Sequence, residues 1–512
     1  MTPIATFCVA GRERMTIEAL TDLGFVFGSP VATATTLLDT FDGRIHRAGL
    51  RLRVSKSERV ELELSGHGTT PAHVTVDITP RVPADIPPGP FRSRIAALID
   101  MRALLPQLRI TSRQTIGVLR DTAGKVVAAA ELHEGIHIVD HPDVTCPAAT
   151  IEIREFAGYA KYTDRTVERL RAAGVDESDT DTLTLCAAAA GVDLSGFKST
   201  ASVPLDGVVE AGEGFRLVLA NLATTIMANW QGTIDQTDPK FLHELRIAVR
   251  RTRVVLANAK QVLPAEILDH TRREMAWLAD ITSTPRDLDV YLLEWSKYTD
   301  PLGADVAPLL EPVRDLLERQ RIDGHFELER CLRSERAATL MNSWQAWLTE
   351  PLAGEAPPLR AGRPLGPLVA ERIARAHAIL LERGRLIGPD TPAAHLHDLR
   401  KDAKKLRYLM ECFGSLFAKR PRKQYVKRLK ALQDNLGEHQ DAEVHVGMLR
   451  AVAIELDQIG TPPDTLVALG RLMERLDQQR LTARVEFAER FADYDNAAGQ
   501  RALDAMLDGI TQ

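Results

Sequence analysis

Two segments of the chain repeat one pattern of histidine and basic residues, His-x2-Arg-x3-basic-basic-x-Arg. The first copy begins at His243 and the second at His397, 154 residues later. Guanidinium and ammonium groups form charge-assisted hydrogen bonds with phosphate and carboxylate oxygens. Cations repeated at a fixed spacing therefore point to binding of an anion that carries several negative groups.

Helical geometry places most of each copy on one narrow stripe. At about 100° per residue, positions i, i+3, i+7 and i+10 lie within an arc of roughly 80°. Arg251 and Lys405, at i+8, fall outside it. Like charges on successive turns repel by a few tenths of a kcal/mol per pair, so each stripe needs acidic partners or an anionic ligand. The predicted stripes are His243, Arg246, Arg250 and Arg253, and His397, Arg400, Lys404 and Arg407.

The repeat continues beyond the two stripes. Arg273 and Lys427 each follow their histidine by 30 residues, and Arg286–Asp287 and Gln440–Asp441 follow by 43 and 44. The acids in these pairs are suited to orient the basic rows. Internal similarity of this kind predicts duplicated helical units that stack on each other.

Charge is concentrated around the second copy. Between His395 and Lys430, 12 basic residues stand against three acidic ones, a local charge of +9 in a chain whose net charge is −6. Such a cluster attracts anions locally. The alternative is a solvated helix face, which is the commoner meaning of a single basic helix, and the duplication argues against it. A zinc site is disfavoured because neither histidine has a second ligand at i+4.

Composition indicates a soluble globular protein, with 45% hydrophobic and 26% charged residues. We find neither a signal-peptide pattern at the start nor an apolar run of membrane-spanning length. The cysteines are odd in number and form no CxxC pair, which predicts reduced thiols, a cytoplasmic setting and no zinc knuckle. They are Cys8, Cys146, Cys186, Cys331 and Cys412.

Two parts of the chain differ in periodicity, which predicts an α+β protein. Residues 1–200 alternate apolar and polar residues with period two and predict an antiparallel β domain. Residues 207–512 show helical periodicity and predict an all-α domain. A Pro- and Gly-rich stretch, Pro351 to Pro367, divides this domain into repeat units of about 207–350 and 365–512.

The helical part resembles the CHAD family, the conserved-histidine α-helical domain. The resemblance rests on both copies of the pattern together with Arg286–Val290, Leu406–Glu411 and Leu432–Asp441. It implies two four-helix units related by a pseudo-twofold axis, with a basic channel between them that binds inorganic polyphosphate. The residues it implies for this contact are His243, Arg246, Arg250, Arg253, His397, Arg400, Lys404 and Arg407, joined by Arg273, Lys427 and Lys430.

The N-terminal part is similar to the CYTH domain, an antiparallel β-tunnel whose members include triphosphatases. The similarity implies residual anion binding in the tunnel by Arg51, Arg53 and Arg113. Catalytic members open with Glu-x-Glu-x-Lys, which supplies metal ligands, whereas Ile4–Cys8 here contains no acid. We therefore predict no catalytic residue and no metal. The matching segments are Leu38–Thr40, Ala48–Arg53, Leu62–Gly66, Ser112–Arg113 and Ile151–Ile153.

Three hypotheses follow. The first is a polyphosphate binder without catalysis or cofactor, associated with polyphosphate granules in the cytoplasm. The second is a metal-dependent triphosphatase or polyphosphatase that uses the tunnel. The third is nucleic-acid binding, which is disfavoured because only Tyr408 and Tyr425 lie within the basic cluster as stacking aromatics. No membrane partner is predicted.

Overall fold

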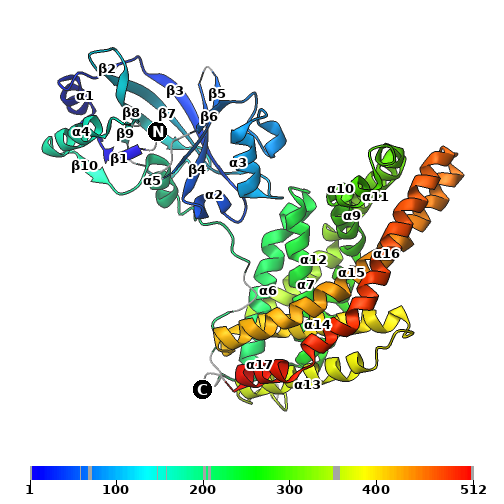
Figure 1. Cartoon of the computed structure of the whole chain (residues 1–512). Coiled ribbons are helices and arrows are strands. Elements are labelled where there is room, and N and C mark those ends of the chain that lie inside the picture. Colours follow the sequence, from blue (N-terminus) through cyan, green and yellow to red (C-terminus); the bar gives the residue numbers. More distant parts are fainter. Residues whose placement is uncertain are drawn as a thin grey trace. The chain divides into compact units, whose positions relative to one another are not determined.

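The computed structural model describes residues 3–57, 59–66, 72–146, 148–156, 158–199, 203–205, 209–349 and 358–508. It divides into two compact units, Met1–Lys198 and Ser199–Gln512 (Figure 1). The first combines an antiparallel sheet with helices, and the second is helical. This agrees with the predicted fold class. Part of the predicted Pro- and Gly-rich division, residues 351–357, lies outside the described residues.

A single antiparallel sheet forms the N-terminal unit. The strand order is β10-β1-β9-β8-β7-β3-β4-β5-β6, and β2 pairs with β7. The strands are β1 (Pro3–Cys8), β2 (Val26–Phe27), β3 (Val31–Asp39), β4 (Leu50–Lys56), β5 (Val60–Gly66), β6 (Ala72–Thr75), β7 (Leu105–Arg120), β8 (Val126–Ile138), β9 (Ala149–Glu155) and β10 (Asp176–Ser178). The helices are α1 (Glu13–Thr21), α2 (Arg44–Arg47), α3 (Pro90–Ile99), α4 (Ala160–Ala172) and α5 (Thr182–Ala189), with a 3₁₀ turn η1 (Pro83–Asp85).

The two faces of the sheet carry different residues, as strand alternation requires. On β9, Ile151 and Ile153 belong to an apolar cluster that includes Leu170 of α4. Helices α1 and α4 lie side by side there (Figure 1). Glu152 and Arg154, at the alternate positions of β9, are also buried, on the opposite face. That face forms a charged interior.

The sheet curls strongly enough to bring distant strands together. Arg154 on β9 lies 3.2 Å from Glu63 on β5, although four strands separate β9 from β5 in the sheet order. In a flat sheet the two strands would be roughly 24 Å apart, at about 4.8 Å per strand. The curvature is consistent with the predicted tunnel-like fold.

Buried ion pairs fill the interior. Arg154, 1% exposed, also lies 2.8 Å from Glu131 and 3.7 Å from Glu152. Arg53 lies 2.7 Å from Glu63. Glu131 and Glu152 face each other directly across β8 and β9, a pairing of like charges that is unfavourable by itself. The two guanidinium groups therefore hold this part of the unit together.

The helical unit has two halves, and the first three helices of one half correspond to the first three helices of the other. The first half contains α6 (Ala211–Ile234), α7 (Pro239–Asn258), α8 (Ala265–Ile281), α9 (Ser283–Leu293), α10 (Trp295–Thr299), α11 (Glu311–Leu332) and α12 (Glu335–Thr349), with 3₁₀ turns η2 (Asp300–Leu302) and η3 (Ala307–Leu310). The second contains α13 (Leu365–Arg385), α14 (Ala393–Cys412), η4 (Gly414–Leu416), α15 (Lys419–Gln458), α16 (Pro463–Tyr494) and α17 (Ala497–Leu507). The starts of α6 and α13, of α7 and α14, and of α8 and α15 are each 154 residues apart.

The halves differ where α8 ends. Helix α15 continues through the region that α8 and α9 occupy in the first half, whereas the first half is interrupted at Thr282. Pro285 explains the interruption, because proline lacks the N–H that continues a helix and its ring collides with the preceding turn. The residue 154 positions later is His439, which has a backbone N–H and does not interrupt α15.

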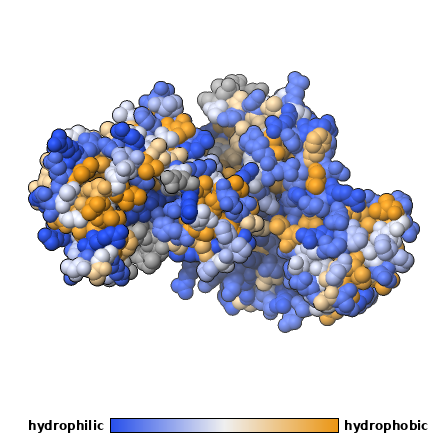
Figure 2. Space-filling model, turned by 90° about the horizontal axis from the view of Figure 1, so that it is seen from above, coloured by the Kyte–Doolittle hydropathy of each residue, from blue (hydrophilic) through white to orange (hydrophobic). Residues whose placement is uncertain are grey.

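One apolar core joins the two halves. Its buried members come from α6, α7, α8, α11 and α12 of the first half and from α13 to α17 of the second. Phe215 and Phe413, one from each half, have ring centroids 4.9 Å apart. The halves are therefore parts of one folding unit. In the described part of the chain no helix is both long and apolar enough to cross a membrane, and the face seen in Figure 2 is mostly hydrophilic, with apolar patches between.

The first prediction concerns Arg154. Arg154→Ala removes one of the two guanidinium groups that pair with the buried carboxylates and should lower the free energy of unfolding of the N-terminal unit by about 3–5 kcal/mol. All five tryptophans lie after residue 207, so tryptophan fluorescence follows the helical unit and far-UV circular dichroism follows both. We expect the variant to show an additional unfolding transition at lower denaturant concentration, which circular dichroism detects and tryptophan fluorescence does not. Arg113→Ala, at an exposed position, is the control, and an unchanged Arg154→Ala profile would contradict the role given to Arg154.

Candidate anion-binding site

Helices α7 and α14 pack against each other and place both basic patterns on one cavity. The cavity has a volume of about 1050 Å³. The structure thus brings together side chains that the 154-residue repeat separates in sequence. The predicted site residues that line it are His243, Arg246, Arg250, His397, Arg400, Lys404 and Arg407.

Four predicted residues do not line this cavity. Arg253, Arg273, Lys427 and Lys430 are exposed and lie outside it. Arg253 is the counterpart of Arg407, so the two repeats do not contribute equally. The i+10 position of the stripe reaches the cavity from α14 and not from α7.

The two basic residues predicted to lie off the stripes make ion pairs within the protein. Arg251 of α7 donates to Glu411 of α14, with an Nη2–Oε2 distance of 2.7 Å. Lys405 lies 2.9 Å from Asp402 on its own helix. Arg251 therefore links the two helices that carry the site.

Two arginines of the cavity are held by neighbouring groups. Arg246, 6% exposed, donates to the hydroxyls of Thr282 at 3.1 Å and Ser283 at 3.0 Å. Burial, with the charge of Arg250 next in effect, lowers the pKa of Arg246 to about 10. Its counterpart Arg400 donates to Asp441 at 2.8 Å. These contacts fix the direction of each guanidinium group.

Arg250 and Lys404 have no acidic partner among the described residues. They occupy equivalent positions on α7 and α14, and each feels the charge of the other. Burial and then the charges of Arg400 and Arg250 lower the pKa of Lys404 to about 8. Two cations that face one cavity and form no ion pair make it a place where an anion is stabilised, although Asp441 also acts on Lys404 through its charge.

The two histidines have different surroundings. The Nδ1 atom of His397 donates to Oε1 of Gln440 at 2.5 Å, which accounts for the 43-residue spacing seen in sequence. Burial and then the charges of Arg286 and Lys240 lower the pKa of His243 to about 4. His243 is therefore neutral near pH 7, and its counterpart is oriented by an amide.

Sequence reasoning missed several cavity residues. Arg286 lines the cavity, and the matched 43-residue spacing was the signal that would have added it to the site. Lys297 and Arg475 also line it, but they have no counterpart in the repeated pattern that would mark them. The lining also includes acids on α9, at the α9–α10 junction, and on α15 and α16, namely Asp287, Glu294, Glu438, Asp441 and Glu486.

The predicted anion-binding arginines of the tunnel are placed differently from expectation. Arg53 is half-buried and pairs with Glu63, and although burial opposes its charge, the surrounding acids raise its pKa. Arg51 lies 3.6 Å from Asp181. Arg113 is exposed, whereas its neighbour Ser112 contacts His133 in the interior, so the expectation that Arg113 lies in the tunnel is wrong. A register shift of β7 against β8 occurs between Thr111 and Arg113.

One group in the described residues has the composition of a metal site. Glu131, His133 and Glu152 place ligand atoms within 4.8 Å of one another. Arg154, however, already bonds Glu131 at 2.8 Å, and Arg53 lies 3.9 Å from Glu152. A divalent ion would have to share these carboxylates with two resident guanidinium groups.

The second prediction tests the link between α7 and α14. Glu411→Gln removes the charge that Arg251 pairs with across the half-buried interface and should lower the free energy of unfolding by about 1–3 kcal/mol. Tryptophan fluorescence during urea denaturation measures this change. Asp398→Asn removes an exposed acid on the same helix and should change stability by less than about 0.5 kcal/mol. Equal effects of the two variants would argue against the link.

Parts of the chain are similar to known proteins. Residues 217–450 match the family model of the CHAD domain. An uncharacterized protein of Mycobacterium tuberculosis, Rv2226, is 24% identical over 231 residues, which cover 43% of this chain and 42% of that protein.

Solved structures were also found. The CHAD domain from the plant Ricinus communis is 26% identical, with a TM-score of 0.46, and covers 60% of this chain and 96% of its own. PptA from Streptomyces chartreusis is 21% identical, with a TM-score of 0.42, and covers 56% and 100%. From the family match over residues 217–450, we conclude that the helical unit of this chain contains a CHAD domain.

Proposed function

We propose that the helical unit binds inorganic polyphosphate in the cavity between α7 and α14 and does not catalyse its conversion. The observation that carries the proposal is the pair Arg250 and Lys404, which face one cavity from equivalent repeat positions without acidic partners in the described chain. In the cell, such binding would place the protein on polyphosphate granules in the cytoplasm.

Polyphosphate fits the chemistry of the cavity better than a single phosphate does. The basic residues form two rows on two helices, and a linear anion with about one charge per phosphate can contact several of them at once. Each charge-assisted contact contributes about 1.5–3 kcal/mol. The ligand presents no base edge to read, so charge and spacing carry the recognition. The family resemblance independently implies the same ligand.

Nucleic acid is a poorer candidate for this cavity. A single-strand binder uses exposed aromatic rings on which bases stack. Tyr408 is buried, and Tyr425 is fully buried in a hydrogen-bonded group with His377 and Tyr494. Neither tyrosine of the basic cluster offers a free ring face.

The third prediction concerns Arg250 and Lys404, the two cations that form no ion pair. Replacing both, as Arg250→Glu with Lys404→Glu, should weaken binding of long-chain polyphosphate by about 10²–10⁴-fold, because two contacts of about 1.5–3 kcal/mol each are lost. The binding is measured by isothermal titration calorimetry. The matched control is Arg253→Glu with Lys427→Glu, which changes net charge equally at exposed positions outside the cavity.

The control separates a site from a general field of positive charge. If both double variants lose binding equally, the cavity is not the binding site. Affinity of the unmodified protein should fall steeply between about 50 and 200 mM salt, by analogy with counterion release from nucleic acids. Competition by single-stranded DNA at fixed salt should leave polyphosphate bound, and efficient displacement would favour the nucleic-acid alternative.

The fourth prediction follows from the lowered pKa of Lys404, about 8. A phosphate beside Lys404 stabilises its charged form, so binding above pH 8 must take up a proton. Between about pH 7.5 and 9 the charged fraction of a group with this pKa falls about eightfold, and affinity should fall by a similar factor. Lys404→Arg keeps the charge and should remove most of this dependence. A pH profile unchanged by Lys404→Arg would contradict the assignment.

A further inference from the structure

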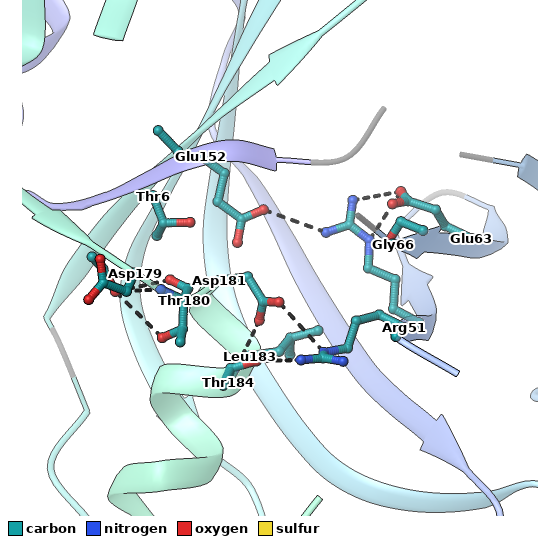
Figure 3. Close-up of a pocket in the computed structure, with 15 residues that line it drawn as sticks. Thr6, Arg51, Glu63, Gly66, Glu152, Asp179, Thr180, Asp181, Leu183 and Thr184 are labelled. Atoms are coloured by element: carbon teal, nitrogen blue, oxygen red, sulfur yellow. Dashed lines mark hydrogen bonds and ion pairs between the residues drawn. The ribbon is translucent and has the colours of Figure 1, made fainter. Parts of the chain in front are cut away.

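The N-terminal unit has a separate cavity of about 190 Å³ in its curled sheet (Figure 3). Its walls come from β1, β4, β5 and β9 and from the chain between Ser178 and Thr184. Figure 3 shows Thr6 and Glu152 on one side, Asp181 on another, and Arg51 opposite them. These elements belong to one compact unit.

The charge of this cavity is negative. Four carboxylates line it, those of Glu63, Glu152, Asp179 and Asp181, against two guanidinium groups, those of Arg51 and Arg53. Two negative charges remain. The neighbouring Arg154 lies 2.8 Å from Glu131 and 3.2 Å from Glu63, and burial raises the pKa of Glu131 to about 7, so the cavity with its neighbours remains negative near pH 7.

Both guanidinium groups of the lining are already engaged. Arg53 donates two hydrogen bonds to Oε2 of Glu63, at 3.1 and 2.7 Å. Arg51 lies 3.6 Å from Asp181 and donates to Thr184 at 3.5 Å. An incoming phosphate would have to displace carboxylates from both arginines and would meet the excess negative charge.

Two buried hydroxyls in the lining have no partner. Thr6 and Ser65 are 3% and 6% exposed, and neither side chain makes a hydrogen bond within the described part of the chain. Both line the cavity. Both hydroxyls are therefore available to a ligand that enters the cavity and bonds them.

Thr6 and Glu152 form a ready acceptor pair. They lie directly opposite each other in the ladder of β1 and β9, which places their side chains on one face about 4.5–5.5 Å apart at Cβ. On the other side of Thr6, its ladder partner is Ser178 of β10. A primary ammonium group has three N–H donors, and this row offers a carboxylate and hydroxyls as acceptors.

We propose that this cavity binds a small alkyl diammonium ion with four or five carbon atoms. One ammonium group bonds Glu152 and Thr6, and the other lies toward Asp179 and Asp181 at the exposed mouth. Two positive charges match the two excess negative charges of the lining. A six-atom diamine also suits the volume, which is comparable to that of about six water molecules at roughly 30 Å³ each.

The shape and contacts disfavour a bare metal ion in the same place. Mg²⁺ requires near-octahedral oxygen ligands at about 2.0–2.1 Å. The acids that approach each other most closely here, Glu131 and Glu152, are shared with Arg154 and Arg53. A diammonium ion needs no fixed coordination geometry. Its first ammonium group bonds Glu152, which Arg53 approaches only to 3.9 Å, and its second lies toward Asp179 and Asp181, apart from the Glu131–Arg154 pair.

The fifth prediction is tested by calorimetry of the full chain with 1,4-diaminobutane. We expect one binding site per chain and at least a tenfold weaker response to 1-aminobutane. Glu152→Gln and Thr6→Val should each weaken binding of the diamine by about tenfold, which is the loss of roughly one charge-assisted hydrogen bond. Glu168→Gln removes one exposed acid of α4 in the same unit and should leave the affinity within about twofold.

Circular dichroism checks that each variant folds. If Glu152→Gln does not fold, the test rests on Thr6→Val, which conserves the shape of the side chain.

Absence of diamine binding would overturn the proposal, as would equal binding by all variants. Binding of Mg²⁺ that excludes the diamine and is lost in Glu152→Gln would identify a metal site instead. Tripolyphosphate bound by the Arg250→Glu, Lys404→Glu protein, and bound more tightly after Glu152→Gln, would identify an anion site and also overturn it.

Discussion

Packing of α7 against α14 is the contact on which the chemistry of the helical unit depends. Leu245 and Val249 of α7 and Leu406 and Leu409 of α14 all belong to the common apolar core. Burial of each such side chain is worth about 1.5–3 kcal/mol, whereas repulsion between like charges on successive helical turns is a few tenths of a kcal/mol. The apolar faces can therefore hold the two basic rows together, and the repulsion remains available to stabilise a bound anion.

Arginine has opposite roles in the two units. In the N-terminal unit, Arg154 is buried and Arg53 half-buried, and both are surrounded by carboxylates, so their charges are neutralised within the fold. Arg250 of the helical unit has no acidic partner in the described chain. Both kinds of residue follow a regular spacing in the sequence. The difference lies in what the neighbouring elements present to them, which is acidic strands in one unit and a second basic helix in the other.

The sequence predicted the fold class and much of the candidate cavity because both follow from periodicity. Helical spacing put Arg246, Arg250 and Lys404 on one side of their helices, and the constant offset indicated that the two helices are equivalent. Other placements depend on tertiary packing. Arg475 comes from α16, which the repeated pattern does not include. Arg113 was misplaced because strand alternation and the adjacent register shift direct Ser112 inward and Arg113 outward.

The interruption at Thr282 explains why the two repeats are no longer equivalent. Pro285 ends the continuous helix of the first half, and the hydroxyls of Thr282 and Ser283 at the break accept hydrogen bonds from Arg246. In the second half, the residues 154 positions later are Leu436 and Gly437 within the continuous α15, which have no hydroxyl.

Arg400 accordingly bonds Asp441 instead of a hydroxyl. Its guanidinium group is held by a charged partner, whereas that of Arg246 is held by neutral ones. A bound anion must therefore compete with a hydrogen-bonded carboxylate at Arg400, whereas at Arg246 the carboxylate of Asp287 acts only through its charge. The break at Pro285 thus leaves the two equivalent arginines of the cavity with chemically different partners, hydroxyls in the first repeat and a carboxylate in the second.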